Sequence, residues 1–123
     1  MNGKPTVLIV EDNADLAEAT KRFLELKRFN VLTSDGKNLQ QLLEEYTPDI
    51  IILDISLGAL NGREICKSLK QNEKTKTIPV IMLSAHEKLS KAYEDNCADG
   101  YIMKPFALDE LLDEIQLLIQ IPE

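Results

Sequence analysis

The amino-acid sequence predicts an α/β fold, a doubly wound parallel sheet with helices on both faces. The main observation is an alternation, repeated five times, between short apolar runs and longer amphipathic stretches. The apolar runs are nearly unbroken, as in strands that are buried on both faces. Strands that alternate with helices are joined by right-handed crossovers, so all strands are expected to run in the same direction.

The strands are expected in the short apolar runs, several of which are β-branched. They lie at Val7–Val10, around Val31, at Asp49–Asp54, at Ile78–Ser84 and at Gly100–Met103. The chain therefore supplies five strands to one sheet.

The first three helices are expected between these runs, where apolar residues recur at helical spacing. The first has one face made of Leu16, Thr20, Phe23, Leu24 and Lys27. The second has a face made of Leu39, Leu42, Leu43 and Tyr46, and Pro48 ends it. The third opens at Asn61 with Glu64 three residues later, which resembles a capping box.

Two further helices follow. The fourth is expected at about Lys88–Asn96. The last has the clearest apolar face, from Leu108 to Ile119, with acidic residues opposite and Pro122 as its stop. Ala107 precedes it and offers no side-chain oxygen, so this helix is expected to begin with a weak cap.

Composition and charge limit the possible functions. The 123 residues fit one domain, taken here as residues 1–123. A net charge of -7 argues against a nucleic-acid surface and against adhesion to anionic membranes. Cys66 and Cys97 are too few for a disulfide framework and lack nearby partners for zinc. No stretch resembles a signal peptide or a membrane span, so a cytoplasmic protein is expected.

Functional side chains are expected at the carboxyl ends of the strands, where open parallel sheets form their sites. The strand ends deliver Glu11, Asp12, Asp54, Ser84 and Lys104. Three neighbouring carboxylates repel one another unless some are protonated or share a cation. Carboxylate oxygens without His or Cys suit Mg2+ better than zinc. Asp54 held beside Mg2+ could act as a nucleophile and form an aspartyl phosphate, with Lys104 and Ser84 binding phosphoryl oxygens.

Each of these residues alone has a simpler explanation. Asp12 or Asn13 could cap the first helix, and Ser84 could cap the fourth. Lys104 could be a solvated charge, and Asp54 could be an ordinary turn residue. Their convergence on one rim of the sheet favours a shared site.

Several segments resemble the receiver domains of response regulators, which serve bacterial two-component signalling. The matching segments are VLIVEDN, DIIILD, the GRE after Asn61, PVIMLSA and ADGYIMKPF. The resemblance runs from about Thr6 to Ile119, nearly the whole chain. It implies a flavodoxin-like sheet of five parallel strands in the order 2-1-3-4-5.

The resemblance also implies a role for each matching residue near the metal. Asp54 matches the phosphoacceptor. Asp12 matches the direct ligand of Mg2+ or Mn2+, and Glu11 matches the acid that holds the metal mostly through water. Ser56 matches the position whose backbone carbonyl binds the metal.

Other matching residues concern the response to phosphorylation. Ser84 matches the hydroxyl that hydrogen-bonds the phosphoryl group, and Lys104 matches the lysine that pairs with it. The Lys104-Pro105 peptide bond is cis in the family. Tyr101 matches the aromatic residue that turns inward on activation. Tyr101 could also be an ordinary strand residue whose hydroxyl lies at the surface.

Some positions depart from the family pattern. Gly58 stands where Pro is common, which predicts a more flexible loop. The stretch from Ser84 to Lys104 is shorter than usual, so the fourth helix or the loop before it should be trimmed. His86 and Ser56 are candidates for tuning dephosphorylation, although His86 could equally be an exposed loop side chain.

The resemblance implies a phosphorylation-dependent switch. A sensor histidine kinase or a histidine phosphotransfer protein would phosphorylate Asp54, and the surface of the fourth helix, fifth strand and fifth helix would respond. Such a domain modifies only itself and is not an enzyme in the usual sense. The resemblance does not indicate the downstream partner.

Three other functions remain open. A receiver-like scaffold would bind partners without phosphorylation. A Mg2+-dependent phosphohydrolase with an Asp nucleophile would carry a second Asp where this chain has Ser56. A flavodoxin-like cofactor binder would need a phosphate-cradling loop after the first strand, where Glu11 and Asp12 would repel phosphate.

Overall fold

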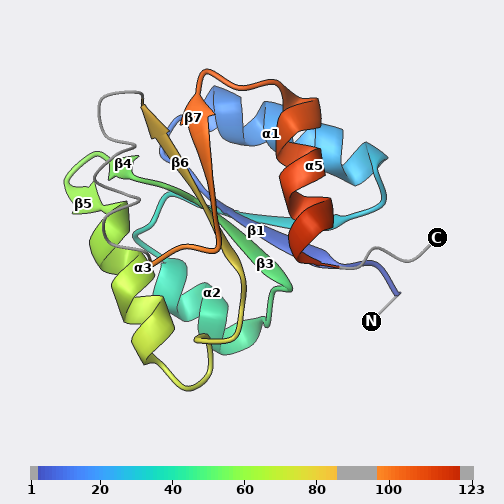
Figure 1. The fold of residues 1–123 in the computed structure, drawn as a ribbon. Helices are drawn as coiled ribbons and strands as arrows, with labels where there is room; N and C mark the ends of the chain where they lie inside the picture. Colours follow the sequence, from blue (N-terminus) through green and yellow to red (C-terminus); the bar gives the residue numbers. More distant parts are fainter. Residues whose placement is uncertain (1–2, 86–96, 120–123) are drawn as a thin grey trace.

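A computed structural model describes residues 3–85 and 97–119, and it shows a five-stranded sheet between two layers of helices (Figure 1). The strands are β1 Thr6–Val10, β2 Asn30–Ser34, β3 Ile50–Asp54, β6 Val80–Ala85 and β7 Gly100–Lys104. They are all parallel and follow the order β2-β1-β3-β6-β7. This order is the expected 2-1-3-4-5, because β6 and β7 are the fourth and fifth strands of the sheet.

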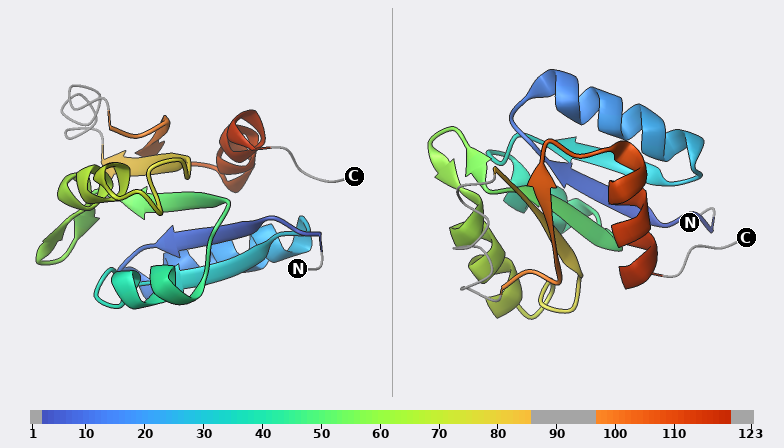
Figure 2. Two further views of the ribbon diagram at one scale, coloured as in Figure 1. Left: turned by 90° about the horizontal axis from the view of Figure 1, so that it is seen from below. Right: turned by 45° about the horizontal axis from the view of Figure 1, so that its top comes forward.

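The helices cover both faces of the sheet, as the doubly wound fold requires. On one face lie α1 Ala14–Leu26 and α5 Leu108–Leu118, side by side (Figures 1 and 2). On the other face lie α2 Leu39–Glu45 and α3 Gly62–Gln71. The helix expected at 88–96 lies outside the described residues. None of the helices in the described ranges is long and apolar enough to cross a membrane.

Two layers of core explain why the sequences of the central strands are almost entirely apolar. In β1, Val7 and Ile9 belong to the layer beneath α1 and α5. The intervening Leu8 and Val10 belong to the layer beneath α2 and α3. Successive side chains of a strand point to opposite faces, so a strand covered on both faces needs apolar residues at every position. The central strands β1 and β3 are buried along their whole length.

The helix starts differ in how they are capped. Asn13, not Asp12, caps α1, because its side-chain oxygen accepts the backbone N–H of Leu16 at 3.0 Å. Asn61 caps α3 by accepting the N–H of Arg63 at 2.9 Å, rather than that of Glu64 as in a capping box. Ala107 makes no side-chain cap at the start of α5, as the sequence predicted.

A short antiparallel pair of strands follows β3, in a segment that was expected to be a flexible loop. It consists of β4 Ser56–Leu57 and β5 Leu60–Asn61. Gly58 lies in its turn with φ of 63°, a left-handed conformation. Proline has a fixed φ near -65° and could not adopt this conformation. The turn that the chain makes here therefore favours glycine and excludes proline at this position.

Candidate functional site

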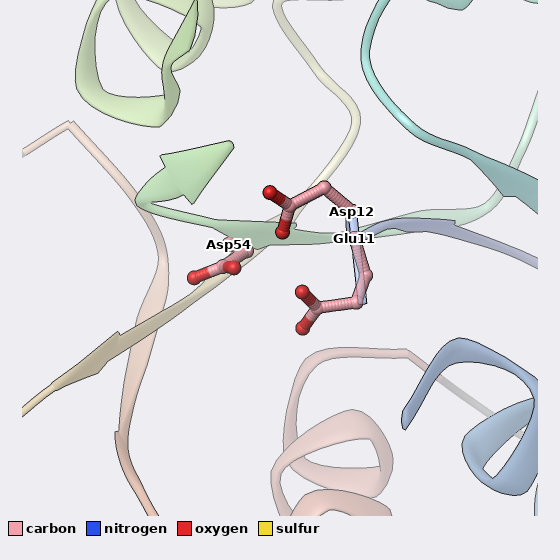
Figure 3. A group of neighbouring side chains, drawn as sticks. All are labelled: Glu11, Asp12 and Asp54. Atoms are coloured by element: carbon pink, nitrogen blue, oxygen red, sulfur yellow. The ribbon is translucent and has the colours of Figure 1, made fainter. Parts of the chain in front are cut away.

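An acidic cluster lies at the carboxyl end of the sheet, where the sequence placed it. Glu11 and Asp12 directly follow β1, and Asp54 is the last residue of β3 (Figure 3). One carboxylate oxygen from each residue lies within 4.8 Å of the others. Strands β1 and β3 are neighbours, with Val10 opposite Leu53, so their ends deliver the three acids to the same point.

Burial makes this cluster electrostatically costly. Glu11 and Asp54 each keep only 4% of their surface exposed, whereas Asp12 is exposed. The pKa of Glu11 is raised to about 7, first by burial and then by the hydrogen bond and charge of the neighbouring Asp54 carboxyl, against the opposing effect of Lys104. The folded protein thus resists placing full negative charge on all three acids.

Lys104 supplies the positive charge that faces these acids. Its Nζ lies 3.0 Å from Glu11 Oε1 and 3.1 Å from Asp54 Oδ2. Burial alone would lower the pKa of Lys104, but the hydrogen bond to Glu11 and the charges of Asp54 and Glu11 outweigh it and raise that pKa. Lys104 ends β7, and the following Lys104-Pro105 peptide bond is cis, as expected.

The donor set suits a hard divalent cation. One ammonium group faces three carboxylates, which leaves negative charge for a cation to balance. All available side-chain ligands are oxygens, and Asp12 is open to solvent, so a cation could keep some of its water. Oxygen ligands combined with retained waters match Mg2+.

The backbone around Asp54 is tightly constrained by the start of α3. The N–H of Ser56 donates to Asp54 Oδ1 at 3.3 Å, and the N–H of Gly62 donates to the carbonyl of Ile55 at 2.8 Å. A Cβ on Gly62 would collide with the backbone carbonyl oxygen of Asp54 and lie 2.7 Å from the Cα of Ile55. Gly62 therefore lets α3 approach the end of β3. The amino-acid sequence signals this role only through the Asn-Gly pair at the helix start, from which it was not predicted.

Ser84 lies on the rim beside Asp54, but its hydroxyl does not donate to the Asp54 carboxylate. It is fully buried near the end of β6, and its hydroxyl donates to the carbonyl oxygen of Ala85 at 2.9 Å. Strands β3 and β6 are paired, and Leu83 of β6 lies opposite Asp54 of β3. Ser84 therefore lies one position further along the rim than the phosphoacceptor candidate Asp54, and its hydroxyl is bonded to the backbone of the next residue.

Tyr101 lies on β7, away from the acids, and packs partly buried against the core layer of α2 and α3. Its hydroxyl accepts the N–H of Ala98 at 3.2 Å. Burial raises the pKa of this hydroxyl. His86, the other residue singled out near the rim, lies outside the described residues.

Comparison with known proteins points to one family. A family model for the response regulator receiver domain matches residues 7–116. The response regulator ArlR of Staphylococcus saprophyticus is 38% identical over 121 residues, which cover 93% of this chain and 52% of that protein. The heme response regulator HssR of the same species is 35% identical, with 94% and 51% covered. The chain therefore spans about half the length of the curated relatives that it matches.

Solved structures agree with this result. A response regulator receiver domain from Bermanella marisrubri is 31% identical with a TM-score of 0.83, and 94% of this chain and 98% of that chain are covered. A receiver domain of a histidine kinase from Syntrophus aciditrophicus is 28% identical with a TM-score of 0.85, covering 97% and 95%. The chain belongs to the response regulator receiver domain family, whose members are phosphorylation-dependent signalling domains of two-component systems.

Proposed function

We propose that Asp54 is the phosphoacceptor of this receiver domain and that its phosphorylation switches the surface of the domain. The observation that carries the proposal is the surroundings of Asp54, a buried carboxylate at a strand end that lies beside two other acids and contacts Lys104. Buried ionisable groups with charged neighbours concentrate at functional sites. Asp12 is exposed, and the raised pKa of Glu11 keeps part of that group protonated at neutral pH, so neither is as well placed as Asp54 to act as the nucleophile.

We assign the metal ligands to Asp12, Asp54 and the backbone carbonyl of Ser56, with Glu11 acting mostly through water. The metal is Mg2+ or Mn2+, both of which take oxygen ligands. When bound, the ion would neutralise charge on the phosphoryl oxygens. The ligand side chains belong to elements fixed by the central sheet, which keeps their separation constant.

The phosphoryl donor would be a phosphohistidine on a sensor histidine kinase or a phosphotransfer protein. An oxygen of the Asp54 carboxylate attacks phosphorus, an O–P bond forms, and the N–P bond to the donor histidine breaks. Lys104 already contacts Asp54 Oδ2, so its ammonium can pair with a phosphoryl oxygen without a large movement. The domain modifies only itself in this reaction, and hydrolysis of the acyl phosphate returns it to its starting state.

The switch would begin at Ser84. Its hydroxyl must leave the carbonyl of Ala85 to donate to a phosphoryl oxygen. Tyr101 would then exchange its hydrogen bond with Ala98 for an inward position. Such a change shifts an equilibrium between two surface arrangements around β7 and α5. We place this switch in one receiver unit, residues 1–123, of a cytoplasmic protein.

Labelling with a small acyl-phosphate donor and Mg2+ tests the assignment. Wild-type protein should take up one phosphoryl group in an alkali-labile form, and Asp54→Asn should take up none. Asp113→Asn is a matched control because Asp113 is exposed on α5, away from the acids. Full labelling of Asp54→Asn would refute the phosphoacceptor assignment, and absence of labelling in all three proteins would favour a scaffold that works without phosphorylation.

A further inference from the structure

Two cysteine thiols meet in the interior, on the side of the sheet opposite α1 and α5. Cys66 lies on α3 and is fully buried, and Cys97 lies before β7 and is half-buried. Both belong to the same packed cluster as Tyr101, and neither is in a disulfide. Cys97 packs against the cluster that contains Cys66, close enough for its thiol to raise the pKa of the Cys66 thiol.

The segments that carry the two thiols are aligned by a neighbouring set of polar contacts. Lys70 follows Cys66 by one turn of α3, and its Nζ lies 2.8 Å from Asp99 Oδ2 and 2.8 Å from the carbonyl oxygen of Ile78. Asp99 also accepts the N–H of Val80 at 2.9 Å and donates its own N–H to the carbonyl of Val80 at 2.8 Å. These bonds fix Asp99 against the start of β6. Cys97, two residues earlier, is thereby held beside the helix that carries Cys66.

We propose that Cys66 and Cys97 form a redox pair that closes into an intramolecular disulfide in the presence of a peroxide. Neither residue belongs to the acidic cluster, so the phosphorylation site does not explain their pairing. In the reducing cytoplasm, protein disulfides are uncommon and those that form are usually transient and redox-sensing. A close thiol pair with one partly exposed member has the form of such a sensor.

The chemistry balances with hydrogen peroxide as the oxidant. The sulfur of Cys97 is the more exposed, so it attacks peroxide first, the O–O bond breaks, and Cys97 becomes a sulfenic acid while one water leaves. The sulfur of Cys66 then attacks the sulfur of Cys97. The S–O bond breaks, and the hydroxide leaves as a second water with the Cys66 proton. Two thiols lose two electrons and peroxide is reduced to two waters.

Burial gives Cys66 the role of the second, resolving thiol. Desolvation raises its pKa, and the neighbouring Cys97 raises it further. A buried thiol that stays protonated reacts poorly with peroxide in solution. It can still attack a sulfenic acid that forms directly beside it, because that reaction is intramolecular.

The disulfide would act on Tyr101, and this part rests on the proposed function. The hydroxyl of Tyr101 accepts the N–H of Ala98, the residue that follows Cys97. A covalent bond from Cys97 to α3 would fix this backbone segment and favour the present arrangement of Tyr101. Oxidation would therefore oppose the movement of Tyr101 that phosphorylation of Asp54 is proposed to cause.

Mass spectrometry of the peroxide-treated monomer tests the pair. We expect the loss of two hydrogen atoms, a peptide cross-linked through Cys66 and Cys97, and full recovery of both thiols with a reductant. In Cys97→Ser, the intramolecular cross-link must disappear and Cys66 should remain a thiol under the same treatment. Because Cys97 is only half-buried, this variant should fold even where Cys66→Ser does not. Two alkylatable thiols after treatment of the wild type, or only intermolecular cross-links, would overturn the proposal.

Tyrosine NMR signals test the effect on the switch, with Tyr101 identified by its absence in Tyr101→Phe. After incubation with an acyl-phosphate donor and Mg2+, the signals of Tyr101 should move in the reduced protein and move less in the oxidised one. An equal movement in both forms overturns the link between the disulfide and Tyr101. Phosphoryl uptake by the reduced protein is measured in the same samples, so failure of the proposed function is recognised separately.

Discussion

At the scale of single residues, the charge of Lys104 offsets much of the repulsion within the acidic cluster. The side chains of Glu11 and Asp54 are 2% and 5% exposed, and Lys104 contacts both. Lys104→Met keeps most of the volume but removes the ammonium. The two acids then lose a partly buried partner, a change that costs on the order of 1–3 kcal/mol. We expect urea unfolding at neutral pH without divalent ions to show a loss of stability in this range.

A surface lysine provides the control for this substitution. Lys76 pairs with Glu73 at 2.9 Å, but both side chains are largely exposed, at 46% and 85%. Exposed pairs of this kind contribute at most about 1 kcal/mol. Lys76→Met should therefore be close to wild type in the same experiment. If Lys104→Met and Lys76→Met lose the same stability, the cluster does not depend on Lys104.

The convergence of the acids and the lysine at one edge of the sheet could be predicted from the sequence, because it follows from the topology alone. The ends of parallel strands meet at one edge, so residues such as Asp12, Asp54 and Lys104 could be placed without knowing any side-chain contact. The hydrogen bond of Ser84 to Ala85 could not be predicted in this way. A hydroxyl has several partners within reach, and the choice among them depends on rotamers that strand spacing does not determine.

At the scale of secondary-structure elements, α1 and α5 differ in the N-cap residue that precedes each helix. Asn13 caps α1 with a side-chain hydrogen bond, whereas Ala107 leaves α5 without one. An N-terminal side-chain cap stabilises a helix by about 1 kcal/mol. Because the φ of -81° and ψ of 145° at Ala107 are those of an ordinary cap residue, Ala107→Ser should stabilise the protein. Asn13→Ala should destabilise it by a similar amount.

Urea unfolding of the two variants measures both effects. Ala59→Ser is the matched control for Ala107→Ser, because Ala59 is exposed in the turn between β4 and β5 and begins no helix. Its stability should stay within about 0.5 kcal/mol of wild type. A destabilised Ala107→Ser would show that the serine side chain does not reach the free N–H groups of α5.

The contact between α3 and the end of β3 depends on Gly62. A Cβ at this position would collide with the backbone of Asp54 and Ile55, and rotation of a side chain cannot relieve such a collision. Gly62→Ala should therefore displace α3 and destabilise the protein by about 1–3 kcal/mol, as overpacking does. It should also slow phosphoryl uptake, because the backbone of Asp54 moves with the helix.

The matched control is Gly100→Ala. A Cβ at Gly100 would meet first the carboxylate end of Glu114 at 3.0 Å, a flexible side chain that can move away. We expect a small change in unfolding and unchanged phosphoryl uptake for this variant. Equal stability and equal uptake rates in the two alanine variants would remove Gly62 from the list of residues that shape the site.

Sequence periodicity predicted the long elements and missed the short ones. The inner strands of the main sheet show nearly continuous apolar runs, and α5 shows a full apolar face, so both patterns could be recognised in the sequence. The strands β4 and β5 contain two residues each, which is too short for any period to appear. Gly58 was recognised as unusual, but its φ of 63° arises from the turn that joins these strands. That turn became visible only in three dimensions.

At the scale of the whole molecule, the stability of the domain should depend on pH through the acidic cluster. The pKa of Glu11 is raised from 4.5 to about 7 in the folded protein, mainly by burial. Below a pH of about 4.5, Glu11 is protonated in both the folded and the unfolded states, so it adds nothing to the pH dependence of the free energy of unfolding. Between about 4.5 and about 7, the unfolded state loses its proton first, so the free energy of unfolding falls as the pH rises.

Removing the titratable group should remove this dependence. Without divalent ions, the wild type should lose on the order of 2–3 kcal/mol more than Glu11→Gln as the pH rises through this interval. Mg2+ should reduce the loss, because a bound cation favours the ionised carboxylate and stabilises only the folded state. Urea unfolding across the pH range, with a chelator or with Mg2+, measures both effects. If wild type and Glu11→Gln keep the same difference in stability at every pH, Glu11 does not titrate with a raised pKa. If Mg2+ stabilises Asp12→Asn as much as the wild type, the ion binds elsewhere and the acidic cluster is not its site.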